Sequence, residues 1–424
     1  MRYSILLAAL LLPLSVVAEP LTFGQALDLA RTRSRQLPAR DAAAAASREM
    51  GVAVRQLPDP VLKFGINNLP VTGPDAFNTT ADFMTMRSVG VAQEFTRGDK
   101  LRARAARYER EAEVAEAGKS LSIANIERDT AQAWLDRHYQ EEIRALLVRQ
   151  RDEVRLQIDA AEAGYRAGRG AQADVFAARL AVAQLDDQIA LADRQVATAT
   201  TLLSRWVGEA AQSPLAGMPV MDAVRTHGGE SADKLDAQIA LHPDITLATK
   251  QEELAKADAE VARANKQTDW SAEFMYNQRG SAYSNMVAVN ISIPLQWNQK
   301  DRQDRELGAK LAQVEQLRAE REEVTRAHVA ELRGLLQAWQ GNRERLARYD
   351  ATLLPLTGER TRAATTAYGT GGGTLAAVLE ARRAQIDMQL ERLRLEMETA
   401  RLWAQLNFLV PTEHKPATDT GSAQ

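Results

Sequence analysis

The stretch YRAGRGAQADVFAAR, residues 165–179, recurs 203 positions later as YGTGGGTLAAVLEAR, residues 368–382, and this repetition decides the fold. The two stretches share a tyrosine, a glycine, a valine, an alanine and an arginine. The matching pairs are Tyr165 and Tyr368, Gly168 and Gly371, Val175 and Val378, Ala178 and Ala381, and Arg179 and Arg382. Further upstream, QAW at residues 132–134 matches QAW at residues 337–339. Because the offset changes little along a whole half, the chain is predicted to be an internal duplication.

Each repeated stretch is predicted to be a tight turn that leads into a long helix. After both turns, apolar residues alternate in steps of three and four, with Arg382 as the polar exception in the second half, which is the pattern of a coiled-coil seam. The seams are Val175, Ala178, Val182, Leu185, Ile189, Ala192, Val196, Ala199, Leu203 and Trp206 in the first half, and Leu375, Leu379, Ile386, Leu390, Leu393, Met397, Ala400 and Ala404 in the second. The segments before the turns are also helix-rich, and Pro355 is expected to kink or interrupt the second of them. Each half is therefore predicted to contain one long helical hairpin.

Two short segments ahead of each hairpin have the alternating pattern of β-strands. They lie near residues 61–69 and 86–95 in the first half, and near 269–278 and 286–296 in the second. Each is close to the roughly 9–11 residues that a tilted transmembrane strand needs. A soluble hairpin covered on one face is the alternative, but the recurrence of two pairs between long helices favours the membrane. Four strands cannot close a barrel in lipid, so several chains are expected to share one.

Composition narrows the possible classes of protein. Residues 1–18 read as a secretory signal, because Arg2 precedes a short apolar run that ends in small residues at Ala18. No later segment has the length of a transmembrane helix, so any membrane crossing must use strands. The absence of cysteine excludes disulfides, thiolate metal sites and the lipidated cysteine of a lipoprotein. A net charge of −3, from 53 basic and 56 acidic residues, argues against a nucleic-acid partner.

The predicted organisation follows from the duplication. After the signal segment, the first repeat covers residues 19–207, a connector rich in proline and glycine covers 208–240, the second repeat covers 241–410, and a flexible tail covers 411–424. The turns of the two helical hairpins are expected near residues 165–174 and 368–375. The predicted fold class is mainly α with a small β part.

The order and doubling of these features resemble the TolC-like family of outer-membrane factors over nearly all of the mature length. Besides the two turns, LTFGQAL at residues 21–27 and LPDP at residues 57–60 look like the family. The resemblance implies a homotrimer with a twelve-helix tunnel, an α-barrel, across the periplasm and a twelve-stranded β-barrel in the lipid of the outer membrane. It also implies a passive exit duct that works with a periplasmic adaptor protein and an inner-membrane RND-type pump.

The resemblance assigns roles to the two turns, which would lie at the inner end of the tunnel where the adaptor's hairpin docks. The docking residues would be Tyr165, Gly168, Val175, Arg179, Tyr368, Gly371, Val378 and Arg382. In some members, two acidic residues on the second turn narrow the entrance. The second matches Glu380, whereas the first falls on Ala377, whose counterpart in the first repeat is Asp174. A ring of Glu380 side chains would favour cations and help to hold a gate. The alternative is that Glu380 and Asp174 only support helix starts or lie on solvated faces.

The cargo is indicated by a second resemblance, which is confined to two short stretches. GINNLP at residues 65–70 and FMTMR at residues 83–87 look like the heavy-metal branch of the family, the partners of copper–silver or cobalt–zinc–cadmium pumps. Met84 and Met86 could offer thioethers to Cu(I) or Ag(I), although packing is the more usual role of methionine. The histidines are scattered without ligand spacing, so no metal site and no cofactor is predicted. Drug or protein export is the alternative to metal export.

Three other classes of protein fit the sequence less well. An enzyme is disfavoured because no catalytic motif stands out, and the glycine run at residues 369–373 lacks the Lys-Ser/Thr of a phosphate loop. A periplasmic adaptor would carry one helical hairpin flanked by several small β modules, whereas two hairpins and four strands are predicted. A soluble coiled-coil scaffold leaves the alternating strands unexplained.

Overall fold

The computed structural model describes residues 19–168, 170–224 and 242–409. These residues form two compact units, and each unit draws on both sequence repeats. The first, the helical unit, comprises residues 19–34, 124–224 and 332–409; the second, the sheet-bearing unit, comprises residues 35–123 and 242–331. The predicted signal segment, the C-terminal tail and the second part of the connector lie outside the described residues.

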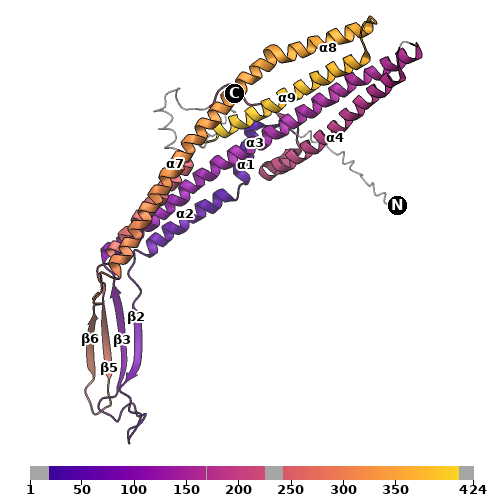
Figure 1. Ribbon diagram of the computed structural model, residues 1–424. Coiled ribbons are helices and arrows are strands. Elements are labelled where there is room, and N and C mark those ends of the chain that lie inside the picture. The colour runs from indigo at the N-terminus through magenta and orange to yellow at the C-terminus, as the bar shows by residue number, and fades with distance from the viewer. Residues whose placement is uncertain (1–18, 169, 225–241, 410–424) are drawn as a thin grey trace, which may run out of the picture. The chain divides into compact units, whose positions relative to one another are not determined.

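Long helices dominate the helical unit, and Figure 1 shows the longest of them side by side. Its helices are α1 (Phe23–Arg33), the C-terminal part of α3 (Gly98–Arg166), α4 (Gln172–Val207), the end of α7 (Gln303–Arg348), α8 (Leu354–Gly369) and α9 (Leu375–Asn407). The short strands β1 (Leu21–Thr22) and β4 (Leu215–Ala216) pair in parallel, and a 3-10 turn, Gly208–Gln212, follows α4. A capping box starts α1, because Thr22 Oγ1 accepts from Gln25 N and Gln25 Oε1 accepts from Thr22 N.

The two predicted hairpins pack against each other through shared apolar clusters. The largest cluster contains Trp134 of α3, Trp339 of α7 and Trp403 of α9. Trp134 and Trp339 belong to the repeated QAW stretches, so equivalent residues of both repeats meet in one core. A second cluster joins Ile143 and Leu147 of α3, Leu185 and Ile189 of α4, and Ile386 and Leu390 of α9. The removal of these coiled-coil seams from water is what holds the hairpins together.

The first helix of the second hairpin is interrupted near Pro355. The helix α7 ends at Arg348, a single π-helical turn covers Tyr349–Leu353, and α8 begins at Leu354. Pro355 has no backbone N–H and cannot donate the hydrogen bond that would continue the preceding helix, and the π-helical turn lies directly before it. The prediction that Pro355 kinks or interrupts this helix agrees with the π-helical turn, although the backbone stays helical on both sides of it.

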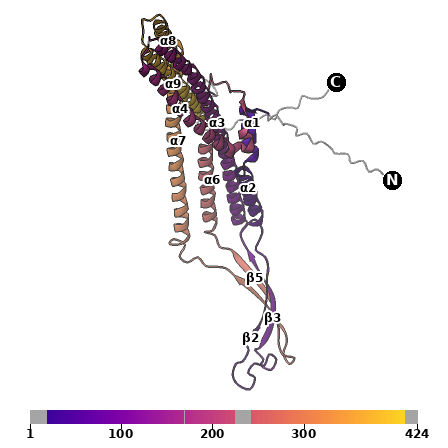
Figure 2. The same ribbon diagram turned by 90° about the vertical axis from the view of Figure 1, so that its right-hand side faces the viewer.

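Four helical segments belong to the sheet-bearing unit. They are α2 (Gln36–Ala53), the N-terminal part of α3, α6 (Pro243–Ala264) and most of α7. Small side chains fill the contacts between neighbours: Ala44 of α2 packs on Ala112 of α3, and Ala255 of α6 packs with Val314 of α7. Figure 2 shows α6 beside α7. The many alanines of the sequence therefore serve helices that lie close together.

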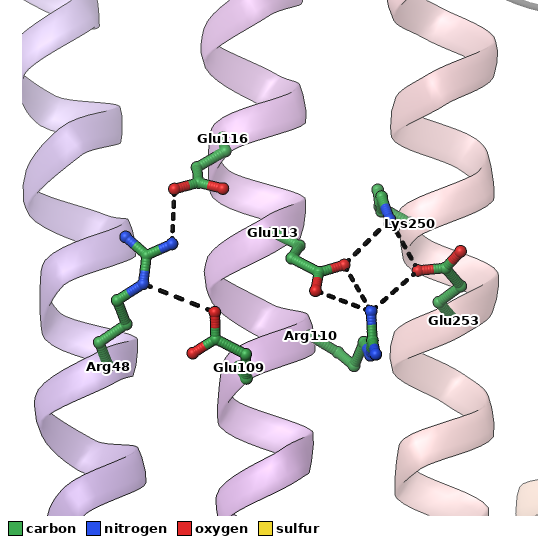
Figure 3. Close-up of polar contacts among 7 residues, drawn as sticks. All are labelled: Arg48, Glu109, Arg110, Glu113, Glu116, Lys250 and Glu253. Carbon is green, nitrogen blue, oxygen red and sulfur yellow. Dashed lines mark hydrogen bonds and ion pairs between the residues drawn. The ribbon is translucent and has the colours of Figure 1, made fainter.

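Ion pairs join α2, α3 and α6 in this unit, as Figure 3 shows. Arg48 of α2 lies 2.6 Å from Glu116 and 3.6 Å from Glu109, both on α3. Glu113, also on α3, points instead toward α6, where Lys250 Nζ lies 3.0 Å from its Oε2 atom. Each such solvent-exposed pair contributes about 0.2–1 kcal/mol, so the network orients the helices more than it stabilises them.

The four predicted strands form one antiparallel sheet. The strands are β2 (Val61–Asn67), β3 (Met86–Phe95), β5 (Trp270–Gln278) and β6 (Met286–Ser292), in the order β2-β3-β5-β6 (Figure 1). The two repeats therefore meet at the β3–β5 pair, where Phe95 lies opposite Trp270 and their rings stack at 4.2 Å. Gly90 of β3 must lack a side chain, because a Cβ there would clash with the carbonyl oxygen of Phe274. The predicted combination of long helical hairpins with a small sheet is confirmed.

The last strand is shorter than predicted. β6 ends at Ser292, whereas alternation of apolar and polar residues had suggested pairing as far as residue 296. Pro294 lies two residues further on and has no backbone N–H to donate, and the ladder stops before it. Among the residues that the structure describes, no helix combines the length and the apolar character needed to cross a membrane.

Candidate functional site

One face of the four-stranded sheet is apolar and exposed. Cross-strand neighbours on it form rows: Leu62, Val91, Phe274 and Val289 make one row, and Phe64, Val89, Tyr276 and Val287 make the next. The exposed fractions of these side chains range from 41% for Tyr276 to 81% for Phe64. Since alternate residues of a strand point to the same face, the alternation seen in the sequence becomes a continuous apolar surface.

The opposite face of the sheet is polar. Lys63 Nζ lies 3.0 Å from Glu273 Oε2, and Asn67 Nδ2 donates to Ser88 Oγ at 2.5 Å. The first contact crosses over β3 from β2 to β5, and the second joins the neighbouring strands β2 and β3. One side of the sheet therefore suits water, while the other suits an apolar environment. A continuous exposed apolar surface of this kind marks an interaction surface.

The first repeated turn ends α3 and starts α4. Gly168 has a φ of +69°, the left-handed conformation in which glycine commonly ends a helix. Ala171 N then donates to Asp174 Oδ2 at 3.1 Å. Asp174 thus satisfies a backbone N–H at the start of α4 and complements the positive end of the helix dipole. The structure gives this predicted entrance residue a helix-starting contact.

The second repeated turn joins α8 to α9 in the same way. Gly371 has a φ of +80°, and Thr374 Oγ1 accepts from Ala377 N at 3.2 Å. Glu380, the predicted gate residue, lies on α9 with its side chain 72% exposed. Its Oε1 atom is 2.7 Å from Arg360 Nη2 on α8. Glu380 is therefore at the surface, and its charge is partly balanced within its own hairpin.

The two turns share a small apolar core. Its buried members are Ala161, Val175, Ala178, Leu375 and Val378, and Tyr368 packs against them. Val175 and Val378, both in the predicted docking set, are therefore enclosed by the chain itself, with exposed fractions of 7% and 0%. Because both side chains are buried in this cluster, they pack the two turns against each other. Tyr165, at 49% exposed, remains on the surface.

The equivalent arginines of the two repeats have different partners. Arg179 Nη2 lies 2.8 Å from Glu162 Oε1, which keeps the contact within the first hairpin. Arg382 Nη1 lies 2.6 Å from Glu153 Oε2 on α3, which links the second hairpin to the first. The duplication is therefore asymmetric at its turns, a difference that aligned sequence letters do not reveal.

The two methionines singled out for soft metal ions lie at the start of β3. Met84 is in the preceding loop with its side chain 50% exposed, and its carbonyl oxygen accepts from Asn68 Nδ2 at 3.3 Å. Met86 is the first residue of β3 and lies opposite Asn67 of β2.

The structure also brings His328 to two side chains that are distant from it in the sequence. His242 and Asp244, at the start of α6, meet His328 of α7, and their ligand atoms all lie within 4.8 Å of one another. His328 follows His242 by 86 positions, so the sequence contains no short metal-binding motif that would predict the cluster. Only the packing of α6 on α7 creates it.

Comparison with known proteins gives a consistent result for the fold. The sequence matches no family model, and no curated protein sequence matches it. Its structure is similar to that of the outer-membrane channel OprN, with 17% identity, a TM-score of 0.76, and 92% of this chain and 90% of that chain covered. It is also similar to the outer membrane protein VceC from Vibrio cholerae, with 17% identity, a TM-score of 0.74, and 91% of this chain and 95% of that chain covered. A third similar structure is that of CusC, described for its transmembrane channel formation, with 16% identity, a TM-score of 0.74, and 93% of this chain and 94% of that chain covered. The chain has the fold of these outer-membrane channel proteins.

Proposed function

We propose that this chain is the outer-membrane channel of a tripartite efflux system, a passive exit duct built from three identical copies. The observation that carries the proposal is the sheet with one exposed apolar face and one polar face. Exposed apolar surface costs about 25 cal/mol per Å² in water, and lipid removes that cost. The polar face would then line a water-filled lumen.

The order of the strands suits closure into a barrel. Within the described sheet, β2 and β6 are the outermost strands, and each pairs on one side only. Because the four strands alternate in direction, β6 of one copy and β2 of the next would pair antiparallel and continue the sheet. Backbone groups in lipid must be hydrogen-bonded, which favours a ring without edges. The number of three copies, and hence twelve strands, rests on the family resemblance.

The two helical hairpins would form the periplasmic tunnel, and their turns would receive the adaptor protein. Exposed Tyr165 and the glycines of both turns support this role, because bare backbone allows a partner helix to approach closely. Glu380 would stand at the entrance, where three copies would place three acidic side chains. Transport would be driven by the inner-membrane pump, and the duct itself would carry out no catalysis.

We propose heavy-metal cations as the cargo, on the basis of the stretches at residues 65–70 and 83–87. The fold does not separate this cargo from drugs or proteins, whose export is the alternative. Deletion of the gene should sensitise the host to copper and silver, or to cobalt, zinc and cadmium. Unchanged resistance to all five metals would refute the cargo but leave the duct proposal intact.

The duct itself is tested by fractionation and cross-linking. The natural chain has no cysteine, so an introduced pair is the sole source of disulfides. Cysteines at Lys63 of β2 and, in separate variants, at Ala288, Asn290 or Ser292 of β6 scan the unknown register between copies on the polar face. We expect outer-membrane protein with covalent dimers and trimers for one register, and none for single-cysteine controls. Soluble periplasmic protein without covalent oligomers in any register would reject the proposal.

A further inference from the structure

We infer that His242, Asp244 and His328 form a binding site for one divalent transition-metal ion, of the zinc and cobalt class. The three residues lie in the sheet-bearing unit and project from two helices. His328 Nε2 lies 3.2 Å from Asp244 Oδ2, and His242 Nδ1 lies 3.7 Å from the same oxygen. Ligands at about 2.0–2.1 Å from a tetrahedral Zn²⁺ are roughly 3.3 Å apart, so small side-chain movements would place all three around one ion.

The local fold explains why these side chains converge. His242 is the N-cap residue of α6, Pro243 opens the helix, and Asp244 lies in the first turn. His328 comes from α7, and its ring lies 4.2 Å from that of His242, tilted by 37°. His242 Nδ1 also accepts from the backbone N–H of Asp244 at 3.3 Å, a long hydrogen bond that metal ligation could replace.

The donor set selects the chemical class of the ion. Two imidazoles and one carboxylate suit zinc, cobalt, nickel or copper, whereas magnesium and calcium prefer oxygen ligands alone. The side chains of His242, Asp244 and His328 are 13%, 37% and 21% exposed. The cluster is thus neither sealed nor fully solvated, so an ion can enter and keep a water molecule as a fourth ligand.

A second carboxylate supports the site from outside. Glu331 Oε2 lies 3.6 Å from Nδ1 of His328, on the side of the ring opposite Nε2. Histidines that bind metals usually donate their other ring N–H to a carboxylate, which fixes the tautomer and strengthens the ligand. Glu331 also offsets the positive end of the α6 dipole, which by itself disfavours a cation. An ordinary His–Asp ion pair at a helix start is the competing explanation.

A bound metal ion would link the start of α6 to α7 within the sheet-bearing unit. This inference does not rest on the proposed duct function, because the three ligands belong to one chain and to one unit of it. Failure of the cross-linking experiment above would leave it unaffected.

The experiment uses the whole mature protein in detergent, freed of any histidine tag and stripped with EDTA. Titration with Zn²⁺ in a calorimeter should show one ion per chain, and Co²⁺ should give the strong visible absorption of a tetrahedral site. His328→Gln and His242→Asn should each lower the affinity at least tenfold. The asparagine retains the capping of α6 because it is itself a good N-cap residue. Glu331→Gln should lower the affinity about tenfold.

The matched control is His138→Gln, which removes a histidine that stacks on Trp134 in the helical unit. It should leave the titration unchanged. Thermal unfolding in EDTA verifies that each variant is folded, and Zn²⁺ should raise the unfolding midpoint of the wild type but not of the two ligand variants. A wild type that binds no Zn²⁺, or variants that bind it as tightly as the wild type, would overturn the inference and leave the ion-pair explanation.

Discussion

Arg382 of α9 reaches across to Glu153 of α3, with 2.6 Å between Nη1 and Oε2. This ion pair ties the turn of the second repeat to a helix of the first. Its counterpart Arg179 pairs with Glu162 in its own hairpin. The two arginines occupy equivalent positions of the duplication, so variants of each test which contacts hold the two turns in place.

Arg382→Ala should loosen the second turn without unfolding the chain. The pair is partly exposed, so its loss should cost less than about 1 kcal/mol of stability. If the turns control the entrance, single channels of the Arg382 variant should open more often in planar bilayers. Arg179→Ala removes a similar charge but no link between hairpins, and should leave the opening frequency unchanged. Equal behaviour of both variants would contradict this assignment.

Val378→Ala and Tyr165→Ala should separate packing from docking at the turns. Val378 is fully buried, and loss of two methyl groups there should cost about 1–2.5 kcal/mol, visible as a lower thermal midpoint. Tyr165 is half exposed, so its truncation should leave the midpoint nearly unchanged but weaken binding of a purified adaptor protein. The docking role of Tyr165 fails if adaptor affinity stays at the wild-type value.

Arg31 of α1 pairs with Glu127 of α3, whose side chain has no exposed surface. Arg31→Met would leave a buried carboxylate without this partner, and should destabilise the protein by about 3–5 kcal/mol in chemical or thermal unfolding. The double variant with Glu127→Met removes both charges and should recover most of that loss. A double variant no more stable than the single one would show that packing, not charge, dominates at this contact.

Glu252 of α6 should make the stability of the sheet-bearing unit depend on pH. Hydrogen bonds from Lys256 and Arg321, at 2.6 and 2.8 Å, outweigh burial and lower the pKa of its carboxyl. A lowered pKa in the folded state means stability that is present above the unfolded value and is lost as pH falls through the folded value. Glu252→Gln should therefore cost about 1–3 kcal/mol at pH 7 and less near pH 3. Parallel pH profiles of the two proteins would argue against this role.

Val289 and Asn290 are neighbours on β6 that point to opposite faces of the sheet. Val289→Arg puts a charge on the apolar face, and should cost about 2–4 kcal/mol at the middle of a bilayer and reduce insertion into the outer membrane. Asn290→Arg places the same charge on the polar face, and should insert normally. Similar yields of both variants in outer-membrane fractions would count against a lipid-facing apolar side.

The spacing of apolar residues along the sequence was enough to predict much of the fold. Alternation predicted the strands, most clearly β2 and β5, whose apolar and polar side chains lie on different faces of the sheet, and the three-four spacing predicted the seams of α4 and α9. Boundaries set by backbone chemistry were harder, as the early end of β6 before Pro294 shows. The interruption at Pro355 could be predicted because a proline inside a helix leaves few alternatives.

The candidate functional residues could be predicted from the sequence only in part. The glycines of both turns could be recognised, since reversal of a helix needs the left-handed conformation that Gly168 and Gly371 adopt. The burial of Val175 and Val378 could not, because it depends on how two distant hairpins meet. The cluster around His328 was missed for the same reason: only the contact of α6 with α7 brings His328 to His242 and Asp244.

The junction between β3 and β5 has a consequence for how such a chain can diverge. An undivided half would supply one strand pair and one helical hairpin, and a ring of such halves would be made of identical parts. Fusion of two halves in one polypeptide fixes them in equal number and strict alternation around any closed ring. One of the two turns can then keep the hairpins of a chain linked, as Arg382 does through Glu153, while the other is free to change its chemistry.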